Sequence, residues 1–197
     1  MISNKNVVII VLTTILLITS ACSEEGVRGK YDVVIYGGTS GGIAAAIQTS
    51  RMGKSVVLIE PTRRMGGLTT GGLGATDIGN KQAIGGISRE FYKNIKDHYA
   101  NQANWKWQSR EEYQQDRNDP VQDAMWTFEP KAAQKVFQNL IDEYRIDIRN
   151  NERIDRGSGV NKDGRRILSV IMESGREYNA KVFIDATYEG DLMAEAG

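Results

Sequence analysis

One glycine-rich turn has the residue types and the spacing that suit the binding of a phosphate group. It directly follows the apolar run Asp32–Tyr36 and reads Gly37-Gly38-Thr39-Ser40-Gly41-Gly42. Turns of the G-x-G-x-x-G type join a strand to a helix, and the free N–H groups at the start of that helix attract a pyrophosphate. In this register Thr39 takes the place of the middle glycine. Thr39 must therefore hold a ligand slightly further away or contact it through its hydroxyl group.

An acidic residue stands where a ribose would need a hydrogen-bond acceptor. Glu60 ends a second apolar run, Ser55–Glu60, about 20 positions after the first glycine of the turn, as in dinucleotide-binding folds. A glycine-rich turn between a strand and a helix can also occur without any ligand. The strand before the turn, the helix after it and the acid that ends the second strand favour dinucleotide binding.

The surrounding pattern predicts a strand, a helix and a second strand that position these residues. Small and apolar residues at 41–52 indicate a helix, and Gly53 follows its end, as glycine often does. Further helices are expected at 88–99 and from Pro130 to about 144, where apolar residues recur at helical spacing. We expect an α/β, Rossmann-like fold with helices on both faces of a parallel sheet. That sheet would contain Val33–Tyr36, Val56–Glu60, Ile146–Arg149 and Val182–Asp185, with a β-meander at about 153–180 whose first strand covers 153–160.

A second motif, directly after the acid, extends the pattern. Residues 64–70 read R-M-G-G-L-T-T and contain R-x-G-G-x-x-T. This motif resembles the second motif of the FAD-dependent oxidoreductases of the glutathione-reductase-like superfamily. The chain is similar to a bacterial group of these enzymes, also called xanthan-lyase-like, over Val33–Ala46, Glu60–Gly74, Trp126–Phe137 and Phe183–Gly197. That group favours a histidine after the proline at 130, where this chain has Lys131.

The resemblance implies FAD as the cofactor. The residues that it places at the cofactor are Gly37, Gly38, Thr39, Ser40, Gly41, Gly42, Glu60, Arg64, Gly66, Gly67 and Asp185. Asp185 belongs to a strand end that resembles the family segment meeting the flavin dinucleotide, and its alternative role is to fix the following turn. The implied reaction is hydride abstraction by the flavin from a small alcohol, amine or sugar-like substrate, with no catalytic residue identified and no metal. A nucleotide-binding module without turnover, or an inactive fragment, is the alternative.

A polar segment rich in aromatic residues, 100–124, has no clean period. It contains Trp105, Trp107 and Tyr113 among many amide and charged side chains. We expect an insertion that covers the cofactor or the substrate. Its rings could stack on a ring or a sugar, or they could only bury the loop against its own domain.

The first 22 residues have the features of a targeting signal. Lys5 precedes the apolar run Val7–Ile18, which is short for a membrane span, and small residues precede Cys22. This pattern resembles a bacterial lipoprotein signal, in which the cysteine is acylated and becomes the N-terminus. A plain secretory signal or an N-terminal membrane helix is the alternative. We expect an exported protein of the bacterial cell envelope, periplasmic or surface-exposed, lipid-anchored through Cys22, with residues 23–30 as a linker.

Composition limits the remaining functions. The 197 residues include 25 basic and 25 acidic side chains, a balance that gives no indication of a nucleic-acid partner. Cys22 is the only cysteine, so the chain has neither an intrachain disulfide nor a redox-active cysteine pair. Residues 31–197 are expected to form an FAD-binding domain. They are too few for the substrate domain that the family adds, so we expect the sequence to be incomplete.

Overall fold

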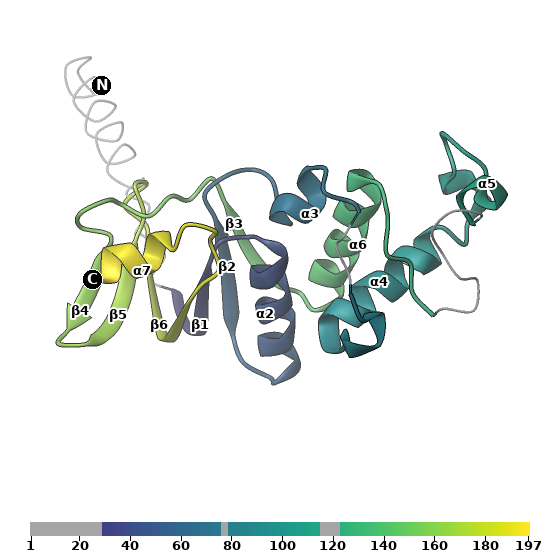
Figure 1. Cartoon of the computed structure of the whole chain (residues 1–197). Helices are drawn as coiled ribbons and strands as arrows, with labels where there is room; N and C mark the ends of the chain where they lie inside the picture. Colours follow the sequence, from purple (N-terminus) through teal and green to yellow (C-terminus); the bar gives the residue numbers. More distant parts are fainter. Residues whose placement is uncertain (1–28, 76–78, 115–122) are drawn as a thin grey trace, which may run out of the picture.

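The computed structural model describes residues 29–75, 79–114 and 123–197, and the signal segment with Cys22 lies outside them. These residues form one sheet of six strands in the order β3-β2-β1-β6-β5-β4 (Figure 1). The strands are β1 (Gly29–Tyr36), β2 (Val56–Glu60), β3 (Asp147–Asn150), β4 (Val160–Asp163), β5 (Arg166–Ile171) and β6 (Glu177–Asp185). Strands β3, β2, β1 and β6 are parallel, whereas β5 and β4 are antiparallel to their neighbours. The predicted four-stranded parallel sheet is confirmed.

The centre of the sheet is buried on both faces, as expected of parallel strands with continuous apolar sequences. In register, Ile35 of β1 lies between Leu58 of β2 and Ile184 of β6. Ile35 and Leu58 belong to the hydrophobic cluster on one face, and Val34 and Val57 belong to the cluster on the other. This alternation follows from the period of two residues along a strand.

The described part of the chain has three long helices and three short ones. They are α2 (Ser40–Arg51), α3 (Gly67–Gly71), α4 (Gly86–His98), α5 (Arg110–Gln114), α6 (Pro130–Glu143) and α7 (Asp191–Ala196), with 3₁₀ turns η1 (Lys81–Ala83) and η2 (Gln102–Asn104). Of these, α5 lies at the end away from the sheet (Figure 1). Apolar side chains of α2, α4 and α6 share one cluster with the sheet, and Leu192 of α7 packs into the cluster on the opposite face. Helices therefore lie on both faces, as predicted. Within the described residues, no helix is both long and apolar enough for a membrane span.

The prediction for the start of the β-meander was wrong. Strands β4 and β5 form the expected hairpin, but residues 153–159 form a loop that contacts the sheet through a bridge between Ile154 and Met172 and a backbone hydrogen bond from Ile171 to Gly159. The hydroxyl of Ser158 donates to Asp155 and Gly157 has a φ of +92°, so local turn chemistry replaces a strand. The N–H of Ile154 instead donates to the buried hydroxyl of Tyr36, at 3.0 Å.

We predict that Tyr36→Phe destabilises the protein, because the substitution leaves the buried N–H of Ile154 without an acceptor. The expected loss of unfolding free energy is about 1–3 kcal/mol, measured by urea denaturation at neutral pH. Tyr188→Phe is the matched control, since Tyr188 is 57% exposed and water can replace its hydroxyl as the acceptor for the N–H of Leu68. Equal losses in the two variants would contradict this account.

Candidate dinucleotide-binding site

The glycine turn lies between the end of β1 and the start of α2, at the carboxyl edge of the parallel strands (Figure 1). Gly37 has a φ of +107°, in the region that favours glycine. A Cβ atom on Gly42 would lie 2.0 Å from the carbonyl oxygen of Gly37 and 3.2 Å from the Cβ of Ala186. The helix can therefore begin directly against the strand end only with glycine at position 42.

Thr39 is the N-cap residue of α2. Its hydroxyl accepts a hydrogen bond from the N–H of Gly42 at 3.2 Å and donates one to the carbonyl of Ala186 at 2.8 Å. The hydroxyl is thus engaged by the protein itself, a use that the sequence did not suggest. The first N–H groups of a helix have no partner within the helix, and those of Ser40 and Gly41 have no acceptor among the described residues. These two groups can bind a phosphate.

The side of the turn at Gly41 is open. A Cβ atom built on Gly41 would meet a single neighbour within 4 Å, the Thr39 hydroxyl oxygen at 3.7 Å. Gly41 is also exposed, so this side of the turn is open to solvent, whereas the opposite side, at Gly42, packs against backbone. The turn fits an anionic group on one side and is closed on the other.

The carboxylate of Glu60 holds the turn and the loop after β2 together. One oxygen accepts the N–H of Gly38 at 2.7 Å, and the other accepts the N–H and the hydroxyl of Thr62 at 2.8 and 2.7 Å. Glu60 is 8% exposed. A carboxylate can accept about four hydrogen bonds, so roughly one position remains for a ribose hydroxyl. The predicted acceptor lies beside the turn, as the dinucleotide pattern requires.

The second motif lies against the first. The N–H of Gly66 donates to the carbonyl of Gly38 at 2.7 Å, and Gly66 forms a parallel bridge with Thr39. Gly66 has a φ of +94°, and a Cβ atom there would lie 2.3 Å from the side chain of Thr70. Gly67 packs against the hydroxyl of Tyr188, where a Cβ atom would lie 2.2 Å away. Both motif glycines are explained by close packing around the turn.

Arg64 does not pack around the turn as the glycines of the second motif do. It lines a groove together with three other positively charged side chains. Arg63 and Arg64 line this groove together with Lys131 and Lys135 of α6, and its volume is about 590 Å³. These four residues make no ion pair within the described part of the chain. Met65 also lines the groove and lies over Gly38, where a Cβ atom would come 2.6 Å from the Met65 sulfur. The cationic groove is therefore next to the turn and suits an anion.

Asp185 is engaged in capping the last helix. Its carboxylate accepts the N–H and the hydroxyl of Thr187 at 2.9 and 2.6 Å, and the N–H of Met193 in α7 at 2.8 Å. Burial alone would raise the pKa of Asp185, but these hydrogen bonds outweigh burial and lower it. The structure gives Asp185 the alternative role considered from the sequence, that of fixing the turn.

Sequence reasoning missed several residues that shape the site: Thr62, Met65, Ala186, Thr187 and Tyr188. Ala186 and Thr187 directly follow Asp185, inside a segment already identified by resemblance, and could have been found there. Thr62 bonds to Glu60 two residues away, a local turn pattern that could also have been found. Met65 and Tyr188 carry no local signal, since their contacts with Gly38 and Leu68 depend on the tertiary structure. In the described part of the chain, no group of three acidic, histidine or cysteine side chains is arranged to hold a metal ion.

The family model described as FAD dependent oxidoreductase matches residues 32–197. Among solved structures, the chain is similar to L-proline dehydrogenase from P. horikoshii, with 16% identity, a TM-score of 0.55, and coverage of 87% of this chain and 57% of that one. It is also similar to a flavin-dependent brominase, with 17% identity, a TM-score of 0.52, and coverage of 85% and 40%. At these identities the likeness shows the fold alone, and the chain spans less than two thirds of either structure. No significant match was found among curated proteins.

The lowered pKa of Asp185 predicts a pH-dependent contribution to stability. A carboxyl group whose pKa is lower in the folded protein stabilises it above the unfolded pKa of about 4, and this contribution is lost as the pH falls through the folded value. Asp185→Asn should lower the unfolding free energy by about 1–2 kcal/mol at pH 7, allowing for partial exposure. The difference from the unsubstituted protein should shrink below about pH 4.

Chemical denaturation across pH values measures this difference. Glu189→Gln, at an exposed position in the same turn, is the matched control and should change stability by less than about 0.5 kcal/mol. A difference for Asp185→Asn that stays constant from pH 7 to pH 3 would show that the carboxylate charge does not matter.

Proposed function

Because the chain belongs to the family of FAD-dependent oxidoreductases, we propose that residues 31–197 form the FAD-binding domain of an enzyme that oxidises a small alcohol, amine or sugar-like substrate. FAD is the cofactor of this family, as the sequence predicted. The observation that carries the proposal is the glycine turn, with free N–H groups on its open side and the carboxylate of Glu60 beside it. When bound, FAD supplies the redox chemistry by accepting a hydride from the substrate.

The residues of this chain would bind and orient the cofactor. The N–H groups of Ser40 and Gly41 would donate to its pyrophosphate, helped by the positive end of the α2 dipole. Glu60 would accept a hydrogen bond from the ribose at its remaining acceptor position. Arg64 would attract the negative charge of the diphosphate from the cationic groove next to the turn. These roles follow from donors and acceptors that the protein leaves open.

Titration of the apoprotein with FAD, followed by flavin fluorescence, tests the proposal. The unsubstituted protein should bind FAD, and Glu60→Gln should lose about 1.5–3 kcal/mol of affinity, roughly 10- to 100-fold, because an amide replaces a charged acceptor. Thr62→Val is the matched control. It removes one donor to the same carboxylate but keeps the charge, so the affinity for FAD should change by less than about threefold.

Two outcomes would contradict parts of the proposal. Equal affinities for the unsubstituted protein and Glu60→Gln would place the dinucleotide elsewhere. A second outcome is that the protein binds FAD, but no alcohol, amine or sugar bleaches the flavin absorption in the absence of oxygen. That result would support the alternative of a nucleotide-binding module without turnover.

The N-terminal segment supports a second part of the proposal, that the protein is exported and lipid-anchored in the cell envelope through Cys22. The support is the apolar run Val7–Ile18 and the small residues before the cysteine. Mass spectrometry of the membrane fraction should find an acylated N-terminal peptide that begins at Cys22. Cys22→Ser should abolish this modification and release the protein from the membrane. A membrane-bound chain that retains Met1 would contradict the prediction.

A further inference from the structure

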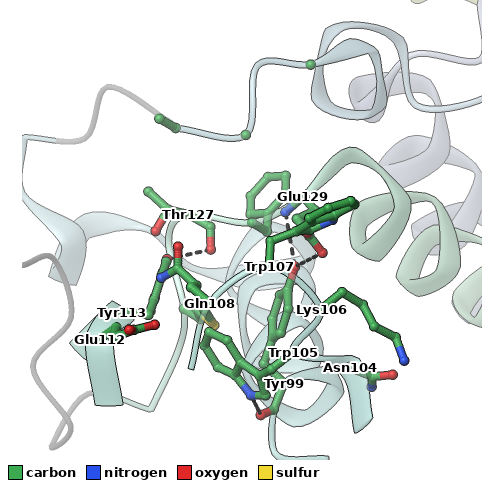
Figure 2. Close-up of a pocket in the computed structure, with 15 residues that line it drawn as sticks. Tyr99, Asn104, Trp105, Lys106, Trp107, Gln108, Glu112, Tyr113, Thr127 and Glu129 are labelled. Atoms are coloured by element: carbon green, nitrogen blue, oxygen red, sulfur yellow. Dashed lines mark hydrogen bonds between the residues drawn. The ribbon is translucent and has the colours of Figure 1, made fainter. Parts of the chain in front are cut away.

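A pocket with aromatic walls lies where α4, η2, α5 and the segment before α6 meet, at the end of the molecule away from the sheet (Figures 1 and 2). Its volume is about 430 Å³, within the range of small-molecule sites. The rings that line it are Tyr99, Trp105, Trp107, Tyr113 and Phe128, and we call it the aromatic pocket. It shares no residue with the glycine turn or with the cationic groove.

The inner wall of the aromatic pocket is held rigidly. The ring of Trp105 lies 5.0 Å from that of Tyr99 and 5.4 Å from that of Tyr113, between centroids. The indole N–H of Trp105 donates to the carbonyl of Tyr99, and the hydroxyl of Tyr113 donates to the carbonyl of Thr127, both at 2.8 Å. A ligand would therefore meet a preformed wall, which reduces the entropy lost on binding.

Trp107 lies on the rim of the pocket and is 89% exposed (Figure 2). Its ring contacts no other ring in the described part of the chain, so it does not bury the loop. Tryptophan normally buries most of its large surface, and a tryptophan left open beside a pocket offers that surface to a ligand. Packing of the insertion does not explain this residue.

Ring orientation distinguishes between possible ligands. The plane of Trp105 is tilted by 49° to that of Tyr99 and by 60° to that of Tyr113. A flat aromatic ligand cannot stack in parallel on two faces that are tilted in this way. A puckered ring with C–H bonds on its faces can contact both.

Polar groups around the rings can both accept and donate hydrogen bonds. Burial raises the pKa of Tyr99 to about 12, so its hydroxyl stays protonated and donates to Glu129 at 3.1 Å, leaving other acceptor positions of that carboxylate free. The Thr127 hydroxyl is buried without a partner among the described residues, although buried polar groups are normally hydrogen-bonded. The amide of Gln108 also lines the pocket and can both donate and accept. Hydroxyl groups on a ligand would pair with these polar groups, because each hydroxyl can both donate and accept a hydrogen bond.

Charge around the pocket is mixed. Glu112 and Glu129 line it and oppose an anionic ligand, whereas Lys106 lines it and opposes a cationic one. From the tilted rings, the open tryptophan and these polar groups, we propose that the aromatic pocket binds a neutral sugar ring. The further assignment of this pocket as the substrate site of the enzyme rests on the proposed function. Sugar binding by the pocket can be tested independently of that function.

Binding of the full chain to an array of neutral mono- and oligosaccharides tests the inference, with the tightest ligand then titrated by calorimetry. Amino sugars and uronic acids on the same array provide the cationic and anionic comparisons. We expect binding to at least one neutral saccharide, weakened about tenfold or more in Trp107→Ala. Because Trp107 is exposed, this variant should remain folded, and circular dichroism checks that.

Two variants separate this inference from the cofactor assignment. Trp107→Ala should keep the FAD affinity of the unsubstituted protein, and Glu60→Gln should keep the saccharide affinity. If the unsubstituted protein binds a neutral saccharide but does not bind FAD, the proposed function is contradicted and the inference stands. Failure to bind any neutral saccharide, binding only to charged sugars, or saccharide binding unaffected by Trp107→Ala would overturn the inference.

Discussion

The contact between Gly42 and the carbonyl of Gly37 is the constraint on which the rest of the structure depends. With no side chain at Gly42, α2 begins directly against the end of β1. This places the free N–H groups of the helix at the carboxyl edge of the parallel strands, where ligands of such sheets bind. It also brings the apolar face of α2 onto Ile35 and Leu58, in the larger hydrophobic cluster. One backbone contact therefore sets both the position of the binding edge and the packing of the core.

Two acidic residues stand at strand ends on this edge, Glu60 of β2 and Asp185 of β6. Their hydrogen-bond partners show what each carboxylate holds in place. The carboxylate of Glu60 joins the glycine turn to the loop after β2 and keeps a position for a ligand hydroxyl. The carboxylate of Asp185 is directed to Thr187 and to the start of α7, and these bonds lower its pKa. Each carboxylate accepts three hydrogen bonds from the protein, so their positions distinguish them: Glu60 contacts the glycine turn at Gly38, whereas the bonds of Asp185 go to residues 187–193. The proposed function therefore assigns the ribose to Glu60, although both acids stand at strand ends in the sequence.

The parts that sequence could predict are those whose cause is local. The strands and the helix around the glycine turn follow from the spacing of apolar residues and from the glycines, and the structure confirms them. Helix α6 is confirmed too, and Pro130 marks its start. The loop at 153–159 was mistaken for a strand because its local turn chemistry was overlooked and because one acceptor that holds it, Tyr36, lies 118 positions from Ile154. The hydroxyl of Thr39 is engaged by Ala186, 147 positions away. Side-chain roles with such distant partners are not revealed by any spacing within one segment, whereas the bonds of Glu60 to Thr62 and of Asp185 to Thr187 span two residues.

The segment from Gly66 to Ala75 connects the glycine turn with the aromatic pocket. At one end, the N–H of Gly66 donates to Gly38; at the other, the carbonyl of Gly74 accepts the N–H of Phe128 at 3.0 Å and Ala75 forms a bridge with Thr127. A Cβ atom on Gly74 would lie 1.9 Å from the carbonyl oxygen of Phe128, so the two backbones touch.

Both ends of this segment are therefore held by backbone contacts, and near the first end the N–H of Leu68 also donates to the hydroxyl of Tyr188. The distance between the two sites is set by the ten residues from 66 to 75, which include the short helix α3. Detachment of either end of the segment would have to break these backbone hydrogen bonds, each of which costs about 1–3 kcal/mol when its groups stay buried and unpaired. If FAD and a sugar bind as proposed, this segment links their two sites through backbone contacts at both of its ends.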